Sequence, residues 1–189
     1  FMGGLRINEK CETDVKGLFA CGEVAGGTHG ANRLAGNALA ETLVFGEIAG
    51  KNAAEFAKSN DFVVSDTEAF LKSLPNVGED SQEKELIKEI KEILWRYLGI
   101  IRDEKVIRTA IKEISNVKNK FENIKSTNNL LAYIKLRNII FVAEAISLAA
   151  LERKESRGAH FRSDYPKEDN NWKKAIIIKN EFGIEHEAR

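Results

Sequence analysis

One stretch limits the possible folds of this chain more than any other: between residues 86 and 101, apolar residues recur every three or four positions. An α-helix places residues at this spacing on one face, and that face has to be buried against other elements. Asp80 and Glu83 match a capping box at the start of the helix. The apolar face consists of Leu86, Ile90, Ile93, Leu94, Tyr97, Leu98 and Ile101.

Two further helices are expected downstream of this one. Asp103 can cap a second helix that runs to about Phe121, and Ser126 or Thr127 can cap a third that runs to about Lys154. Amphipathic helices joined by short connections bury their apolar faces against one another. The sequence therefore predicts a three-helix bundle domain.

The third helix has a segment, residues 139–151, that is apolar on nearly every side and contains one charged residue, Glu144. We expect this helix to lie at the centre of the bundle, covered by its neighbours. A membrane-spanning helix needs about 20 apolar residues, so we expect no span here. The bundle domain is assigned to residues 80–160.

The first part of the chain, residues 1–58, holds most of the fourteen glycines. Extended pieces are expected over residues 4–8 and 17–21, and Glu9-Lys10 suits a hairpin turn after the first. Leu18 to Cys21 is a short apolar run typical of a strand buried on both faces. A glycine-rich turn and a helix follow.

That helix, over about residues 36–58, carries a small residue at every fourth position, which we interpret as a face that packs closely against a sheet. These residues are Ala38, Thr42, Gly46, Gly50 and Ala54. Residues 59–79 read as a linker with a short helix over 67–73. Residues 161–189 read as a C-terminal tail with a strand at 175–179. The predicted fold class is α+β.

Charge and cysteine usage exclude several classes of function. Lysine plus arginine and aspartate plus glutamate each number 29, so the net charge is zero and no nucleic-acid partner is expected. Cys11 and Cys21 show no metal-ligand spacing, so no metal site is expected and both are interpreted as reduced thiols, with a disulfide as the less favoured alternative. No signal peptide opens the chain, which favours a cytoplasmic protein.

The segment after the second extended piece carries the chemistry. Glu23 follows the expected buried strand directly after Gly22. In FAD-binding sheets an acid at such a position accepts hydrogen bonds from the ribityl hydroxyls of the cofactor, and the glycine lets the backbone approach it. A plain turn followed by an exposed glutamate is the alternative. The continuation, His29-Gly30-Ala31-Asn32-Arg33 followed by Leu34 and Asn37, matches the HGANR-L pattern of one flavoprotein family.

On these residues the chain resembles the succinate dehydrogenase/fumarate reductase flavoprotein family, which includes L-aspartate oxidase. Met2-Gly3-Gly4, the Trp95-to-Arg102 pattern and the block from Glu155 to Trp172 extend the resemblance over nearly the whole chain. It implies that residues 1–58 are the C-terminal part of an FAD-binding α/β domain. It also implies hydride transfer between FAD and a four-carbon dicarboxylate, succinate or fumarate.

The resemblance assigns roles to individual residues. Arg33 would bind a substrate carboxylate, since arginine does so bidentately with a charge that does not titrate, and Gly36 could offer its backbone N–H to the same group. A surface ion pair is the alternative role for Arg33. Glu23 and the first helical residues Asn37, Ala38 and Leu39 would hold FAD, with the helix N-terminus facing the flavin pyrimidine edge.

Several other residues are candidates for the site or for structural roles. His29 could hydrogen-bond the flavin, but the role of fixing the loop is favoured. His160 and Arg157 either tie the tail to the bundle or return toward the flavin domain or a partner. Trp172 is interpreted as an anchor for the tail, and His186 as solvent-exposed.

The chain opens on Phe1 before Met2 without a helix cap or polar lead-in, and we expect it to be a fragment or one half of a split protein. The resemblance puts the catalytic acid/base and the nucleotide fingerprint in upstream FAD-binding and capping domains, so no catalytic residue is expected here. It also implies an iron–sulfur partner subunit, through which the protein would reach a membrane. The alternatives are L-aspartate oxidase and a non-catalytic module that docks an iron–sulfur subunit.

Overall fold

A computed structural model describes residues 2–61, 67–79, 82–179 and 183–188. The chain divides into two compact units, Phe1–Ser65 and Asp66–Arg189, and each is described by itself. The division falls within the segment that the sequence suggests as a linker. The α+β class is confirmed, with one long helix in the first unit and a helical bundle in the second.

The first unit consists of extended segments, the 3-10 turn η1 (Gly22–Val24) and helix α1 (Asn37–Ser59). Its extended segments pair through isolated bridges, Leu5 with Ala25 and Glu12 with Phe19. The turn expected at Glu9-Lys10 is present, because the Cys11 N–H donates to the Asn8 carbonyl at 3.0 Å. Leu18 is exposed, so the strand expected to be buried on both faces is not fully covered.

Helix α1 begins and ends within one residue of the prediction, but its small-residue face is not packed as expected. A Cβ built at Gly46 or Gly50 would meet no described heavy atom within 4 Å. Tight packing therefore does not explain these two glycines within the described residues. Cys11 and Cys21 are free thiols, and the buried Cys11 Sγ donates to the Phe45 carbonyl at 3.7 Å.

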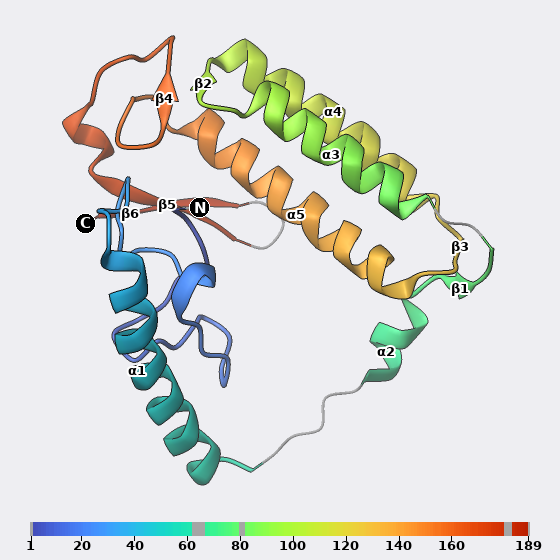
Figure 1. The fold of residues 1–189 in the computed structure, drawn as a ribbon, viewed down its shortest axis with the longest axis horizontal. Helices are drawn as coiled ribbons and strands as arrows, with labels where there is room; N and C mark the ends of the chain where they lie inside the picture. The colour runs from blue at the N-terminus through green and yellow to red at the C-terminus, as the bar shows by residue number, and fades with distance from the viewer. Residues whose placement is uncertain (1, 62–66, 80–81, 180–182, 189) are drawn as a thin grey trace. The chain divides into compact units, whose positions relative to one another are not determined.

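The second unit is built on three long helices that lie side by side in Figure 1, α3 (Glu83–Tyr97), α4 (Glu104–Glu122) and α5 (Leu130–Glu152). Its shorter elements are α2 (Thr67–Lys72), β1 (Asn76–Val77), β2 (Ile101–Arg102), β3 (Ser126–Thr127), β4 (Phe161–Arg162), η2 (Asn170–Trp172), β5 (Lys174–Ile178) and β6 (Ile184–Ala188). Two parallel pairs, β1 with β3 and β2 with β4, join the connections at the helix ends.

The three helices share one apolar core, as expected of the predicted three-helix bundle. The buried residues are Leu86, Ile90, Ile93, Leu98, Ile107, Ala110, Ile114, Val117, Phe121, Leu136, Ile140, Ala143 and Ala150. Ile101, which the spacing also places in this core, is 68% exposed, because α3 ends at Tyr97 and Ile101 lies in β2.

Two expectations for α5 are wrong. Its N-cap is Asn129, whose side chain accepts from Ala132 N–H, because Ser126 and Thr127 are extended in β3 and cannot start the helix. Its neighbours do not cover it on all sides, since Leu131 and Phe141 are exposed. Among the described elements, α5 contacts α3, α4 and β5, and these leave part of its surface open.

The cap at Asp103 is confirmed, since its carboxylate accepts from Val106 N–H at 2.9 Å. Asp80, the first residue of the expected capping box, lies outside the described residues. Glu83 begins α3 and is fully buried, and neither of its carboxylate oxygens has a hydrogen-bond partner among the described residues. The strand expected at 175–179 is present as β5, and it pairs in antiparallel fashion with β6.

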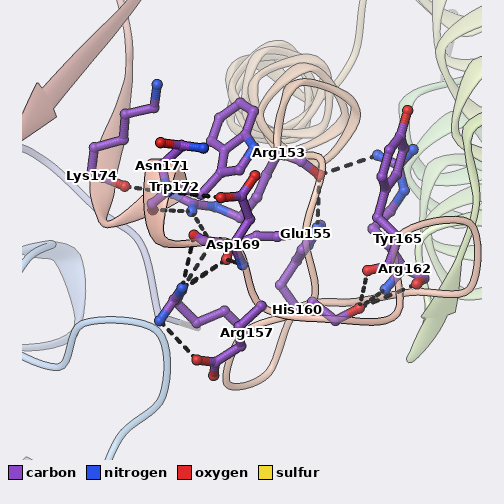
Figure 2. Close-up of polar contacts among 12 residues, drawn as sticks. Arg153, Glu155, Arg157, His160, Arg162, Tyr165, Asp169, Asn171, Trp172 and Lys174 are labelled. Atoms are coloured by element: carbon purple, nitrogen blue, oxygen red, sulfur yellow. Dashed lines mark hydrogen bonds and ion pairs between the residues drawn. The ribbon is translucent and has the colours of Figure 1, made fainter.

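Figure 2 shows a polar network that joins the end of α5 to the tail. The Arg162 guanidinium is fully buried, donates to the carbonyls of Ala150 at 2.9 Å and Leu151 at 3.2 Å, and binds both oxygens of Asp164. It therefore satisfies carbonyls that the end of the helix leaves without partners. Hydrogen bonds from Arg162 lower the pKa of Asp164 to about 2.

A second buried charge in this network is Glu155. It accepts from Arg153 at 2.7 Å, from Arg157 at 2.9 Å and from Asp169 N–H at 3.0 Å. Burial by itself would raise the pKa of Glu155, but the hydrogen bonds, led by those from Arg157, hold that pKa below its usual value. The Trp172 ring makes cation–π contacts with Arg153 and Lys174, in keeping with its interpretation as a tail anchor.

His160 is the neutral member of the network. Its Nδ1 lies 3.0 Å from Arg102 Nη1, and since a guanidinium can only donate, Nδ1 is the acceptor and Nε2 carries the proton. Nε2 lies 3.4 Å from the Arg153 carbonyl, which it faces as a donor. Burial and the charge of Arg102 lower the pKa of His160 to about 4. His160 therefore joins β2 to the tail without carrying charge.

Ile114 and Ile100 offer a matched test of the core. Ile114→Ala removes a fully buried side chain from α4 and should lower the free energy of unfolding by about 2–5 kcal/mol. Ile100→Ala, at a position 83% exposed, should change it by less than about 0.5 kcal/mol. Denaturant unfolding of the two variants gives the comparison. Equal losses of unfolding free energy would show that the apolar core of the bundle is placed wrongly.

Acid should destabilise the protein through His160. The unfolded histidine takes up a proton near its usual pKa of 6.5, whereas the folded one does so only near 4, so stability should fall as pH drops through this window. His160→Gln keeps an acceptor for Arg102 but cannot titrate, and it should reduce the pH dependence of the unfolding free energy by up to one proton. Identical pH dependence in the two proteins, measured by denaturant unfolding, would contradict the assignment.

Candidate functional site

The turn that carries Glu23 is held by a close backbone crossing. Leu5 N–H donates to the Val24 carbonyl at 2.7 Å, and Gly26 N–H donates to the Leu5 carbonyl at 2.9 Å. A Cβ at Gly4 would lie 2.4 Å from the Val24 oxygen, and one at Gly26 would lie 2.8 Å from the Gly4 nitrogen. Only glycine fits at these two positions, which gives a physical reason for Gly4 that the sequence alone did not provide.

Glu23 and Arg33, which the sequence assigns to cofactor and substrate respectively, lie together in the structure. Arg33 Nη1 is 3.4 Å from Glu23 Oε2, and their side chains are 34% and 66% exposed. The alternative role for Arg33, a surface ion pair, is thus present in this structure. An exposed pair of this kind contributes only about 0–1 kcal/mol, and the guanidinium has five N–H donors. Arg33 can therefore still bind a carboxylate from solution.

Gly36 sets the start of α1. Its backbone is left-handed, with φ of 86°, a conformation that glycine adopts without steric cost. As the N-cap it supplies no side chain to the first turn, and that turn contains no acidic residue. The Asn37 N–H donates to the Leu34 carbonyl at 3.3 Å. No described side chain caps the N–H groups that follow, so the positive end of the helix dipole can face an anion.

The surroundings of this helix start suit a flavin. A Cβ at Gly36 would meet no described atom within 4 Å, so the space beside it is open. Leu34, Asn37 and Leu39 are exposed and Ala38 is half-buried. N–H donors without a side-chain cap, with exposed apolar residues before and after them in the sequence, match an aromatic ring system with a polar edge. The residues present therefore fit the cofactor that the sequence implies.

His29 makes a contact that the sequence did not predict. Its Nε2 lies 2.8 Å from Oε2 of Glu41, and Glu41 is only 8% exposed although it is charged. The contact ties the start of the 29–33 segment to the second turn of α1, in keeping with the favoured role of fixing the loop. Sequence reasoning had no means of finding Glu41, because an acidic residue on a helix is ordinarily a solvated one.

The remaining candidates lie in the second unit. Arg157 and His160 belong to the polar network of the tail, where their contacts are structural, and His186 is exposed as expected. Across the described residues no group of three or more His, Cys, Asp and Glu side chains converges as a metal site. The helices in the same part of the chain include none that is long and apolar enough to cross a membrane.

Two family models match the chain. One, described as the fumarate reductase flavoprotein C-terminal domain, matches residues 87–188, which is more than half of the chain. The other, an FAD-binding domain, matches residues 1–39 and so includes the turn at Glu23 and the start of α1. The FAD-binding match lies within the first unit of the fold, and the C-terminal-domain match lies within the second.

Curated relatives align over almost the whole chain. An uncharacterized FAD-dependent oxidoreductase of Methanocaldococcus jannaschii is 46% identical over 185 residues, covering 95% of this chain and 34% of the relative. A CoM/CoB fumarate reductase subunit of Methanothermobacter marburgensis is 37% identical, covering 96% and 35%. An L-aspartate oxidase of Acinetobacter baylyi is 33% identical, covering 96% and 34%. The chain spans about a third of the length of these relatives.

A solved structure confirms the fold. A quinol-fumarate reductase with menaquinol molecules superposes with a TM-score of 0.84 at 32% identity, covering 98% of this chain and 36% of that one. The family match over residues 87–188, the FAD-binding match and the flavoprotein relatives agree with the motifs read from the sequence. The chain belongs to the succinate dehydrogenase/fumarate reductase flavoprotein family, whose cofactor is FAD.

Proposed function

We propose that this chain is the C-terminal part of a flavoprotein oxidoreductase that interconverts succinate and fumarate. One observation carries the proposal: Arg33 lies three residues before Gly36, the N-cap of α1, which offers no side-chain cap and has open space beside it. A cation this close in sequence to the N-terminus of a helix suits a small dianion, which both groups can bind. The 37% identity to a fumarate reductase subunit supports the same reaction.

In this proposal the chain holds and orients the reactants. Arg33 binds one substrate carboxylate, and Gly36 offers its N–H to the same group. Glu23, Asn37, Ala38 and Leu39 contact FAD, which when bound supplies a hydride donor or acceptor. The N-terminus of α1 stabilises negative charge at the flavin's polar edge. Exposed Leu34 and Leu39 help to keep water away from the bound ring.

The proton donor is proposed to lie outside this chain, in a capping domain upstream, and the nucleotide-binding fingerprint in an FAD-binding domain upstream. The chain alone should then be inactive. We also propose that the complete protein works with partner subunits, because the relatives from Methanothermobacter marburgensis and Haemophilus influenzae are named as subunits of fumarate reductases. The resemblance in sequence leads us to propose an iron–sulfur subunit among them and a cytoplasmic location. Any association with a membrane would go through partner subunits.

L-aspartate oxidase remains the alternative, favoured by the 33% identity of the relative from Acinetobacter baylyi over the same share of the chain. The full-length protein should reduce fumarate with a reduced electron donor. It should form no hydrogen peroxide from L-aspartate and oxygen. Peroxide formation that depends on aspartate, without fumarate reduction, would overturn the proposal in favour of the oxidase.

Arg33→Lys in the full-length protein tests the carboxylate contact. Lysine keeps the charge but loses the two parallel N–H donors, so kcat/KM for fumarate should fall by at least about 10-fold. The matched control is Arg108→Lys, an exposed arginine of α4 that pairs with Glu104, and it should leave kcat/KM unchanged. Steady-state assays of both variants give the result, and equal activity of the two would sink the assigned role.

A further inference from the structure

Glu41 is a charged residue in a buried position of α1. It is a carboxylate on the second turn of α1, with a side chain only 6% exposed, and Oε2 lies 2.8 Å from Nε2 of His29. Its other oxygen, Oε1, has no hydrogen-bond partner among the described residues. A desolvated carboxylate of this kind is stable only because of the partner it has. The contact to His29 is therefore the one that a substitution here would break.

The position of His29 lets its contact with Glu41 influence where Arg33 lies. His29 precedes Arg33 by four residues, and Arg33 precedes the N-cap Gly36 by three. The segment 29–36 is thus held at one end by the start of α1 and at the other by the contact between His29 and Glu41, which lie 12 positions apart in the sequence. Between these ends, the ion pair of Arg33 with Glu23 is exposed and weak.

We propose that the His29–Glu41 pair is a positioning latch, which fixes the segment 29–36 against α1 and so places the Arg33 guanidinium for the substrate carboxylate. The substrate part of this inference rests on the proposed function. Neither residue of the latch touches substrate in this account, and each acts through Arg33. A displacement of about 1 Å in a reactant-positioning group can cost about 100-fold in rate, so a loosened segment should be visible in kinetics.

The first test measures the segment without reference to activity. Glu41→Ala is made in the full-length protein, with Glu47→Ala, an exposed glutamate of the same helix, as the matched control. Hydrogen exchange followed by mass spectrometry should show faster exchange over residues 29–36 in Glu41→Ala only, while α3, α4 and α5 keep their protection. Unchanged exchange over 29–36 would overturn the latch, whatever the substrate of the enzyme is.

The second test asks whether the latch acts through Arg33. In Glu41→Ala, kcat/KM for fumarate should fall by roughly 10- to 100-fold, while Glu47→Ala should be unaffected. Combining Glu41→Ala with Arg33→Lys should give little further loss beyond Arg33→Lys alone, because the residue being positioned is already impaired. Full additivity of the two losses would show that Glu41 does not work through Arg33.

Two further outcomes keep the inference testable. If Glu41→Ala does not fold, His29→Ala takes its place, since it removes the same contact from the other side. Glu41→Gln is the conservative variant, since its amide oxygen can still accept from His29. Glu41→Gln should retain most of the wild-type kcat/KM and protection over 29–36, and a loss equal to that of His29→Ala would overturn the proposal. If the wild-type protein does not reduce fumarate, the proposed function fails, and the hydrogen-exchange result alone decides the latch.

Discussion

Every α-helix ends with backbone groups that have no partner within the helix, and the way this chain treats those ends shapes both of its units. In the second unit side chains satisfy several of them: Asp103 caps the start of α4, Asn129 caps the start of α5, and the buried Arg162 binds carbonyls at the end of α5. In the first unit the N-cap of α1 is Gly36, which has no side chain to offer. These satisfied ends stabilise α4 and α5, and the candidate site lies at a helix start without a side-chain cap.

The core of the bundle was predictable because burial follows the helical period. The apolar residues of α3 lie on the face that their spacing predicts, α4 shares the same core, and Asp103 caps where its position indicates. The failures lie where tertiary contacts decide. Ser126 and Thr127 are good caps by residue type, but pairing with β1 makes them extended. Ile101 continues the periodic stripe in sequence, yet α3 has already ended, so the residue is exposed.

Within the candidate site, local backbone features were more predictable than contacts between side chains. The start of α1 could be read from Gly36 and Asn37, since a glycine before a helical run is a local feature. The pairing of Glu23 with Arg33, and of His29 with Glu41, joins residues 10 and 12 positions apart across irregular backbone. No periodicity relates such positions. The sequence could name each of Glu23, Arg33 and His29 without indicating which residue each would contact.

The crossing of Gly4 and Gly26 fixes two backbone segments of the first unit tightly against each other. Backbone meets backbone there at distances that leave no room for a side chain, and two hydrogen bonds of Leu5 join the segment from Met2 to the turn that bears Glu23. The position of that turn therefore depends on the Met2-Gly3-Gly4 segment. A side chain at either glycine would push the two segments apart and move Glu23 with them.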